Sequence, residues 1–254
     1  ALRCADYVVT EAGFGADLGC EKFMDIKCRF AGLQPNAVVL VVTVRALKLH
    51  GGMDKNDLKT ENVEAIKKGF ANVEKHVDTL KRFGVPFVIA MNHFDLDTDA
   101  EVQCVMDLCA ERGYDVVVAK GWADGGNGMT DLAKTIVKLC EQDSKLEFMY
   151  DVNETIAEKI THIVTKVYGG KDVVFTDEAK EQLETFKRHG WDKMPVCMAK
   201  TPISITDDDK VVGAPKGFTV TVRELRISAG AGFVVALTGK VMTMPGLPKK
   251  PAAE

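Results

Sequence analysis

Three runs of apolar, largely β-branched residues constrain what this chain can fold into more than any other feature. The first run, Val38–Val44, is continuous, and similar runs follow at Val85–Met91 and Tyr114–Ala119. Runs without polar alternation are typical of strands that are buried on both faces in a parallel sheet. We therefore expect three parallel strands that are adjacent or nearly adjacent in one sheet.

Segments with helical periodicity separate and follow these strands. Between the first two runs, residues 62–83 place apolar side chains at steps of three and four. A second helix is predicted over residues 99–112, closed by Gly113, and a third over residues 129–141. Helices of this length join parallel strands by right-handed crossovers. The pattern predicts an α/β fold in which this region is part of a doubly wound, mostly parallel sheet of the P-loop type.

The pattern changes near residue 145. Helices are predicted over residues 156–168 and from the N-cap residue Thr176 to residue 189, and two β segments follow at 218–227 and 233–238. We predict a first domain at residues 1–148, which is part of an α/β region, and a smaller α+β domain at residues 149–254. Near the start of the chain, Tyr7–Thr10 is also predicted to be a buried strand.

Composition and charge exclude several classes of function. The chain has 254 residues and a net charge of −4, so no basic face indicates nucleic-acid binding. No apolar run reaches the roughly 18 residues that span a bilayer. The seven cysteines are odd in number and lack paired or metal-ligand spacing, which fits free thiols in a reducing compartment. We expect a cytoplasmic protein without a metal site built from its own side chains and with no nucleic-acid or membrane partner.

Three short blocks rich in glycine, proline, hydroxyl and sulfur residues stand apart from these patterns. They are too irregular for a helix or strand and too apolar for a flexible linker. Such blocks indicate backbone that is held close to something a side chain would obstruct. The three blocks are Pro195–Thr201, Ser228–Phe233 and Met242–Pro248, and a glycine-rich segment, Thr10–Gly19, lies near the start of the chain.

On these blocks, the chain resembles the C-terminal half of the formate–tetrahydrofolate ligases, and the resemblance extends from the first ten residues to the last. It implies a reaction in which ATP, formate and tetrahydrofolate give 10-formyltetrahydrofolate, ADP and phosphate. It also implies Mg²⁺ with ATP, a monovalent cation, and a homo-oligomer, which is a tetramer in the family. Residues 1–148 would then be the C-terminal part of a nucleotide- and folate-binding region.

The family's ATP-cradling loop, with its Gly-x-x-x-x-Gly-Lys-Ser/Thr pattern, does not occur in the sequence. We therefore interpret the chain as a portion of a larger ligase and expect this portion alone to be inactive. The alternative interpretation is a non-catalytic folate-site fragment or pseudoenzyme that serves binding or assembly. A GTP-dependent switch, suggested by the spacing Asn92-x-x-Asp95, would need a phosphate loop as well.

Two aromatic residues directly follow predicted strands, where an open α/β sheet binds its ligand. Phe94 follows the second strand, and Trp122 follows the third and precedes a pair of glycines. From the residues alone, the two rings either clamp a flat heterocycle or cap the hydrophobic core. The resemblance implies the first role, with Phe94 and Trp122 holding the pterin and aminobenzoyl rings of folate. Family members commonly have Pro after this Phe, whereas this chain has Asp95.

The resemblance also implies a cavity for nucleotide and formyl phosphate near the start of the chain. Phe14 matches a residue that lines this cavity in the family, and the flanking Gly13 and Gly15 permit close approach of the backbone. Glu11 is a further candidate, although a carboxylate at this position could equally cap a loop. The phosphate-binding Lys and Arg residues are expected outside this chain.

Overall fold

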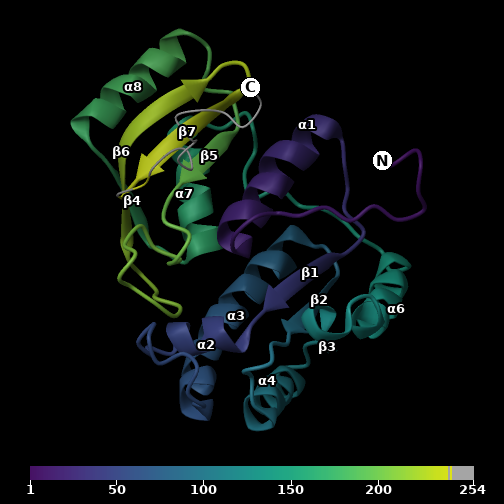
Figure 1. Ribbon diagram of the computed structural model, residues 1–254. Coiled ribbons are helices and arrows are strands. Elements are labelled where there is room, and N and C mark those ends of the chain that lie inside the picture. Colours follow the sequence, from purple (N-terminus) through teal and green to yellow (C-terminus); the bar gives the residue numbers. More distant parts are fainter. Residues whose placement is uncertain (240, 242–254) are drawn as a thin grey trace, which may run out of the picture. The chain divides into compact units, whose positions relative to one another are not determined.

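A computed structural model describes residues 1–239 and 241 (Figure 1). The chain divides into two compact units, Ala1–Met149 with Val212–Ala214, and Tyr150–Val211 with the described residues from Pro215 onward. Each unit contains its own sheet. The block Met242–Pro248 lies outside the described residues, and the assignment of functional domains stays a prediction.

The first unit is built on three parallel strands, β1 (Val38–Val42), β2 (Phe87–Asn92) and β3 (Val116–Ala119), in the order β1-β2-β3. Each strand pairs in continuous register with its neighbour. The prediction of three adjacent parallel strands is therefore confirmed. The unit is of the α/β class, while the doubly wound P-loop topology stays a prediction.

Helices lie on both faces of this sheet. On one face, α6 (Thr130–Cys140) packs Leu132 against Val88 of β2 in a small apolar cluster. Figure 1 shows α3 (Val63–Phe83) and α4 (Asp99–Glu111) on the other side of the strands. Burial on both faces holds for the central strand β2 and explains its lack of polar alternation, whereas Val41 of β1 is 61% exposed.

Side-chain caps mark where two helices of this unit begin, and a left-handed glycine marks where one of them ends. The Thr43 hydroxyl accepts a backbone N–H at the start of α2 (Val44–His50), and the Asn62 side chain does the same for α3. Gly84, with φ at +71°, ends α3 in the left-handed conformation. Two short helices connect β3 to α6: α5 (Gly121–Asp124) and η3 (Asn127–Met129).

The start of the chain differs from the prediction. Tyr7–Thr10 forms no strand, and Val9 is 85% exposed. An apolar run becomes a strand only where a neighbouring strand supplies hydrogen-bond partners, and none of the described strands pairs with this segment. The next segment is a largely π-helical stretch. It consists of η1 (Ala16–Cys20), η2 (Phe23–Cys28) and the short α1 (Arg29–Ala31).

The second unit contains a mixed sheet in the order β4-β6-β7-β5. Strands β6 and β7 are antiparallel, whereas β4 pairs in parallel with β6 and β5 with β7. Both predicted helices and both predicted β segments are present. The helices are α7 (Ile156–His162), which continues into the π-helical η4 (Ile163–Tyr168), and α8 (Asp177–Arg188). The strands are β4 (Asp172–Phe175), β5 (Val196–Ala199), β6 (Thr219–Ser228) and β7 (Phe233–Thr238).

Two of the motif blocks have structural roles in this sheet. The prediction that Pro195–Thr201 is neither helix nor strand is wrong, because pairing with β7 gives residues 196–199 a regular ladder. The block Ser228–Phe233 closes the hairpin between β6 and β7. There the Ser228 carbonyl accepts the N–H groups of Ala231 and Gly232, which closes the turn.

Candidate functional site

The ends of β2 and β3 bring two candidate loops to the same edge of the first sheet. Asn92 is in register with Ala119, and the His93 N–H donates to the Ala119 carbonyl across 3.0 Å. The loops that carry Phe94 and Trp122 therefore leave the sheet side by side. In open parallel sheets, this carboxyl edge is where ligands bind.

A closed turn holds the loop of Phe94. The Phe94 N–H donates to Asp97 Oδ2 across 2.9 Å, and the Asp97 N–H donates to the Phe94 carbonyl, also across 2.9 Å. Burial raises the pKa of Asp97, while the hydrogen bond from the Phe94 N–H acts in the opposite direction. The next residue, Thr98, caps α4, so the turn runs directly into a helix.

A buried ion pair anchors this turn to two other helices. Glu101 Oε1 accepts from Lys48 Nζ across 2.8 Å and from the Asn62 N–H across 3.0 Å, while Oε2 accepts from the Thr98 N–H across 3.2 Å. Burial raises the pKa of Glu101, but the hydrogen bonds from Lys48 and the two backbone donors outweigh it and hold the pKa below its usual value. Glu101 thus joins α2, the start of α3 and the Phe94 turn.

A second compact loop holds Trp122, which lies on α5. The Lys120 N–H donates to the Gly128 carbonyl across 3.0 Å and closes the loop at its base. A Cβ on Gly128 would overlap the Lys120 carbonyl, and a Cβ on Gly121 would meet the sulfur of a neighbouring Met at 2.9 Å. Gly128 is therefore needed where the two ends of the loop touch, whereas the flexible Met side chain beside Gly121 can move.

Both aromatic rings are accessible. Phe94 is 39% exposed and Trp122 is 76% exposed, so neither side chain is part of the hydrophobic core. Within the described residues, no ring–ring contact joins the two. Their role in binding stays a prediction.

Phe14, the candidate at the second predicted cavity, has an unusual backbone. Its φ is +66°, in the left-handed region that residues with a side chain rarely adopt, and the residue is 79% exposed. The carbonyl of Gly15 accepts the N–H groups of Leu18 and Gly19, each across 3.0 Å, and so begins η1. Glu11 is exposed in the irregular segment before this turn.

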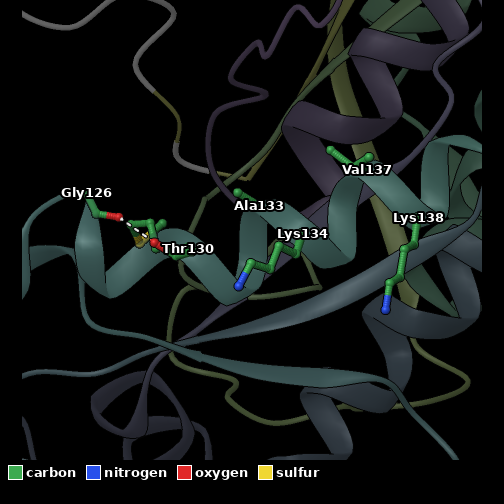
Figure 2. A pocket seen from close by; sticks show the side chains of 7 residues that line it. Gly126, Thr130, Ala133, Lys134, Val137 and Lys138 are labelled. Carbon is green, nitrogen blue, oxygen red and sulfur yellow. Dashed lines mark hydrogen bonds between the residues drawn. The ribbon is translucent and has the colours of Figure 1, made fainter.

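A groove of about 590 Å³ runs along the outer side of α6 (Figure 2). One of its lining residues, Gly126, belongs to the loop that carries Trp122. Ala133 and Val137 extend to one side of the helix, and the side chains of Lys134 and Lys138 extend to the other. None of the predicted aromatic site residues lines this groove. It is therefore a separate feature from the predicted ring-binding position.

Within residues 1–239 and 241, no group of three or more His, Cys, Asp or Glu side chains is arranged to hold a metal ion. This finding concerns a site made of protein groups alone, because Mg²⁺ bound with a nucleotide takes most of its ligands from phosphate and water. Among the described helices, none is both long and apolar enough to cross a membrane.

Comparison with protein-family models relates the chain to known proteins. The model of the formate–tetrahydrofolate ligases matches residues 1–254. The chain belongs to this family. The resemblance inferred from the sequence is thereby confirmed, and the family is one of ligases that act on formate and tetrahydrofolate.

The sequence located the aromatic candidates but not the residues that position them. The spacing Thr98-x-x-Glu101 is a capping-box pattern and could have located the start of α4. The contact between Lys48 and Glu101 joins positions 53 residues apart and leaves no local signal. The contacts of Gly121 and Gly128 likewise depend on how the loop closes.

Proposed function

We propose that this chain supplies the folate-binding part of an ATP-dependent ligase that joins formate to tetrahydrofolate. One observation carries the proposal: two exposed aromatic residues, Phe94 and Trp122, lie on adjacent loops at the carboxyl edge of a parallel sheet. The pterin and aminobenzoyl rings of folate are flat, and stacking of such a ring on an aromatic side chain contributes ~1–3 kcal/mol. Membership of the ligase family supports folate as the ligand.

In the proposed reaction, a formate oxygen attacks the γ-phosphorus of ATP, ADP leaves, and formyl phosphate forms. N10 of tetrahydrofolate then attacks the formyl carbon, phosphate leaves with the electrons of the C–O bond, and the nitrogen loses its proton. This chain contributes positioning, because a ring held between Phe94 and Trp122 keeps N10 within reach of the acyl carbon. Phe14 with its flanking glycines, and Glu11, are proposed to line the cavity for nucleotide and formyl phosphate.

We further propose that ATP enters as its Mg²⁺ complex, that a monovalent cation supports activity, and that the ligase is a cytoplasmic homotetramer. These proposals are supported by family membership alone. None of them enters the argument for the ring-binding position.

Intrinsic fluorescence tests the ring-binding position directly. The chain has two Trp residues, and Trp191 stacks on His189 in the second unit with ring centroids 4.7 Å apart. In a Trp191→Phe variant, Trp122 is the remaining indole. Titration with tetrahydrofolate under reducing conditions should change its fluorescence saturably. In the Trp122→Phe variant, the signal of Trp191 should not change.

Calorimetry gives the corresponding affinities. Trp122→Ala removes one stacking face and should weaken tetrahydrofolate binding by ~1–3 kcal/mol, roughly 5- to 150-fold. Trp191→Ala is the matched control and should leave the affinity unchanged. Equal affinities for the Trp122→Ala variant and the unaltered chain would refute the proposed position.

A further inference from the structure

The backbone of Phe14 is held in a conformation that its own side chain disfavours. A residue with a Cβ stays in the left-handed region only where the surrounding structure determines it. The ring of Phe14 is largely exposed, so contacts of the ring itself do not supply the constraint. The constraint must come from the backbone on either side.

The first constraint lies between Gly13 and Gly19. A Cβ on Gly19 would overlap the N, the carbonyl C and the carbonyl O of Gly13. The backbone that precedes Phe14 therefore rests directly on η1, in space that only a glycine leaves free.

The second constraint lies at Gly15. A Cβ there would overlap Asp17 Oδ1 and would meet His76 Cε1 at 3.0 Å. Asp17 and His76 face each other, with 3.9 Å between Oδ1 and Nδ1, and both side chains are largely buried. Because His76 belongs to α3, this contact fixes the turn to the longest described helix of the unit.

We propose that Gly19 and the Asp17–His76 pair are positioning residues, which fix Phe14 in its left-handed conformation and so present its ring to the nucleotide and formyl phosphate cavity. The second half of this statement rests on the proposed function; the first half does not. These residues act through Phe14. Fixing the ring before the ligand arrives reduces the conformational cost of binding.

NMR spectroscopy of the chain labelled at Phe tests whether Gly19 and the Asp17–His76 pair fix the left-handed backbone of Phe14. The ¹³Cα and ¹³Cβ shifts of Phe14 distinguish left-handed from right-handed backbone. Gly19→Ala should move these shifts out of the left-handed range, although Ala is the better helix former. Gly230→Ala is the matched control, because a Cβ there meets no atom within 4 Å, and it should leave Phe14 unchanged.

The His76 contact is tested in the same way. His76→Ala removes the wall beside Gly15 and should also release Phe14, whereas His76→Gln, which keeps a polar side chain of similar reach, should restore the left-handed shifts at least in part. If His76→Ala unfolds the unit, Asp17→Asn is the alternative variant, because Asn has nearly the same shape as Asp. Loss of the Asp17 charge should loosen its contact with His76, and the Phe14 signals should then broaden or shift.

Because the ATP-cradling loop is expected outside this chain, calorimetric titration of the larger ligase with ATP and with tetrahydrofolate tests whether Phe14 lies in the nucleotide and formyl phosphate cavity. Gly19→Ala should weaken ATP binding about fivefold or more, while tetrahydrofolate affinity should stay within about twofold. Left-handed Phe14 shifts retained in Gly19→Ala, His76→Ala and Asp17→Asn would overturn the positioning proposal. Shifts lost without any change in ATP affinity would sustain it and would instead overturn the placement of Phe14 in the nucleotide cavity.

Discussion

The Asp97 carboxylate and the Phe94 backbone N–H are joined by a hydrogen bond of 2.9 Å, and the Phe94 carbonyl receives the Asp97 N–H in return. The turn is therefore closed by two hydrogen bonds in opposite directions. The turn fixes the backbone from which the Phe94 ring, 39% exposed, projects. The candidate ring-binding position thus depends on a carboxylate that need not touch the ligand.

The first prediction follows from this turn. Asp97→Ala removes the acceptor and should weaken tetrahydrofolate binding about two- to tenfold, since a hydrogen bond contributes ~0.5–1.5 kcal/mol. Asp97→Asn keeps a side-chain oxygen as acceptor and should retain most of the affinity. Calorimetry on both variants checks this, and equal losses in the two would mean that the charge of Asp97, not the turn, matters.

The fold was predictable where its signals are local. The composition of the run Val85–Met91 predicts that this strand is buried, and the caps at Asn62 and Thr176 mark the starts of two helices within a few residues. The errors at Tyr7–Thr10 and Pro195–Thr201 have one cause in common. Whether an apolar segment becomes a strand depends on a partner distant in sequence, and β5 has such a partner in β7.

For the candidate site as well, the sequence predicts the local features but not the contacts between distant residues. The positions of Phe94 and Trp122 after buried strands can be read from the sequence. The contacts that position the loops join residues that meet only after folding, as Gly15 meets His76 of α3. Such contacts have no periodicity or motif, so sequence patterns do not reveal them.

The second prediction concerns the buried pair of Lys48 and Glu101. Lys48→Met leaves the Glu101 carboxylate buried without its cation and should lower the free energy of unfolding by ~3–5 kcal/mol. The double variant Lys48→Met/Glu101→Gln has no buried charge and keeps an acceptor for the cap, so it should recover more than half of this loss. Urea unfolding of the single and double variants measures the difference. A double variant no more stable than Lys48→Met would contradict the ion-pair explanation.

The same pair predicts a pH dependence. The folded-state pKa of Glu101 lies below the ordinary Glu value of 4.5. Its contribution to stability is therefore fully present above pH 4.5 and is lost as the pH falls through the folded-state pKa. The unaltered chain should lose this stability in acid, and the double variant, which cannot titrate at position 101, should lose less.

The third prediction separates stability from binding at Phe14. Phe14→Gly removes the conflict between a side chain and left-handed backbone, and the exposed ring gives up little buried area. We expect the free energy of unfolding to rise by ~0.5–1 kcal/mol, or to stay unchanged, while ATP affinity falls. Unfolding in urea and calorimetry with ATP check the two effects. A clear loss of stability would show that the ring holds the turn, contrary to the contacts of Gly13 and Gly15.

The fourth prediction concerns a buried carboxyl group with no assigned role in binding. Glu21 is fully buried in the π-helical stretch, one helical turn from both Asp17 and Asp25. Burial raises its pKa well above 4.5; Lys22 acts in the opposite direction, and Asp25 and Asp17 raise the pKa further. Because Asp25 is paired with Arg29 and accepts the Met149 N–H, the proton belongs on Glu21.

For a group whose folded-state pKa is raised, the contribution to stability is fully present at pH values below its unfolded-state pKa. This contribution is lost as the pH rises from 4.5 through the folded-state pKa of Glu21. Glu21→Gln imitates the protonated form at every pH, so it should raise the free energy of unfolding at pH 8 by roughly 1–3 kcal/mol. The gain should shrink toward zero as the pH approaches 4.5, whereas Glu184→Gln on the exposed side of α8 should show no such trend. Urea unfolding across this pH range measures the difference. A Glu21→Gln variant that is less stable than the unaltered chain at pH 8 would contradict the prediction and would mean that Glu21 is ionised and bound to a cation.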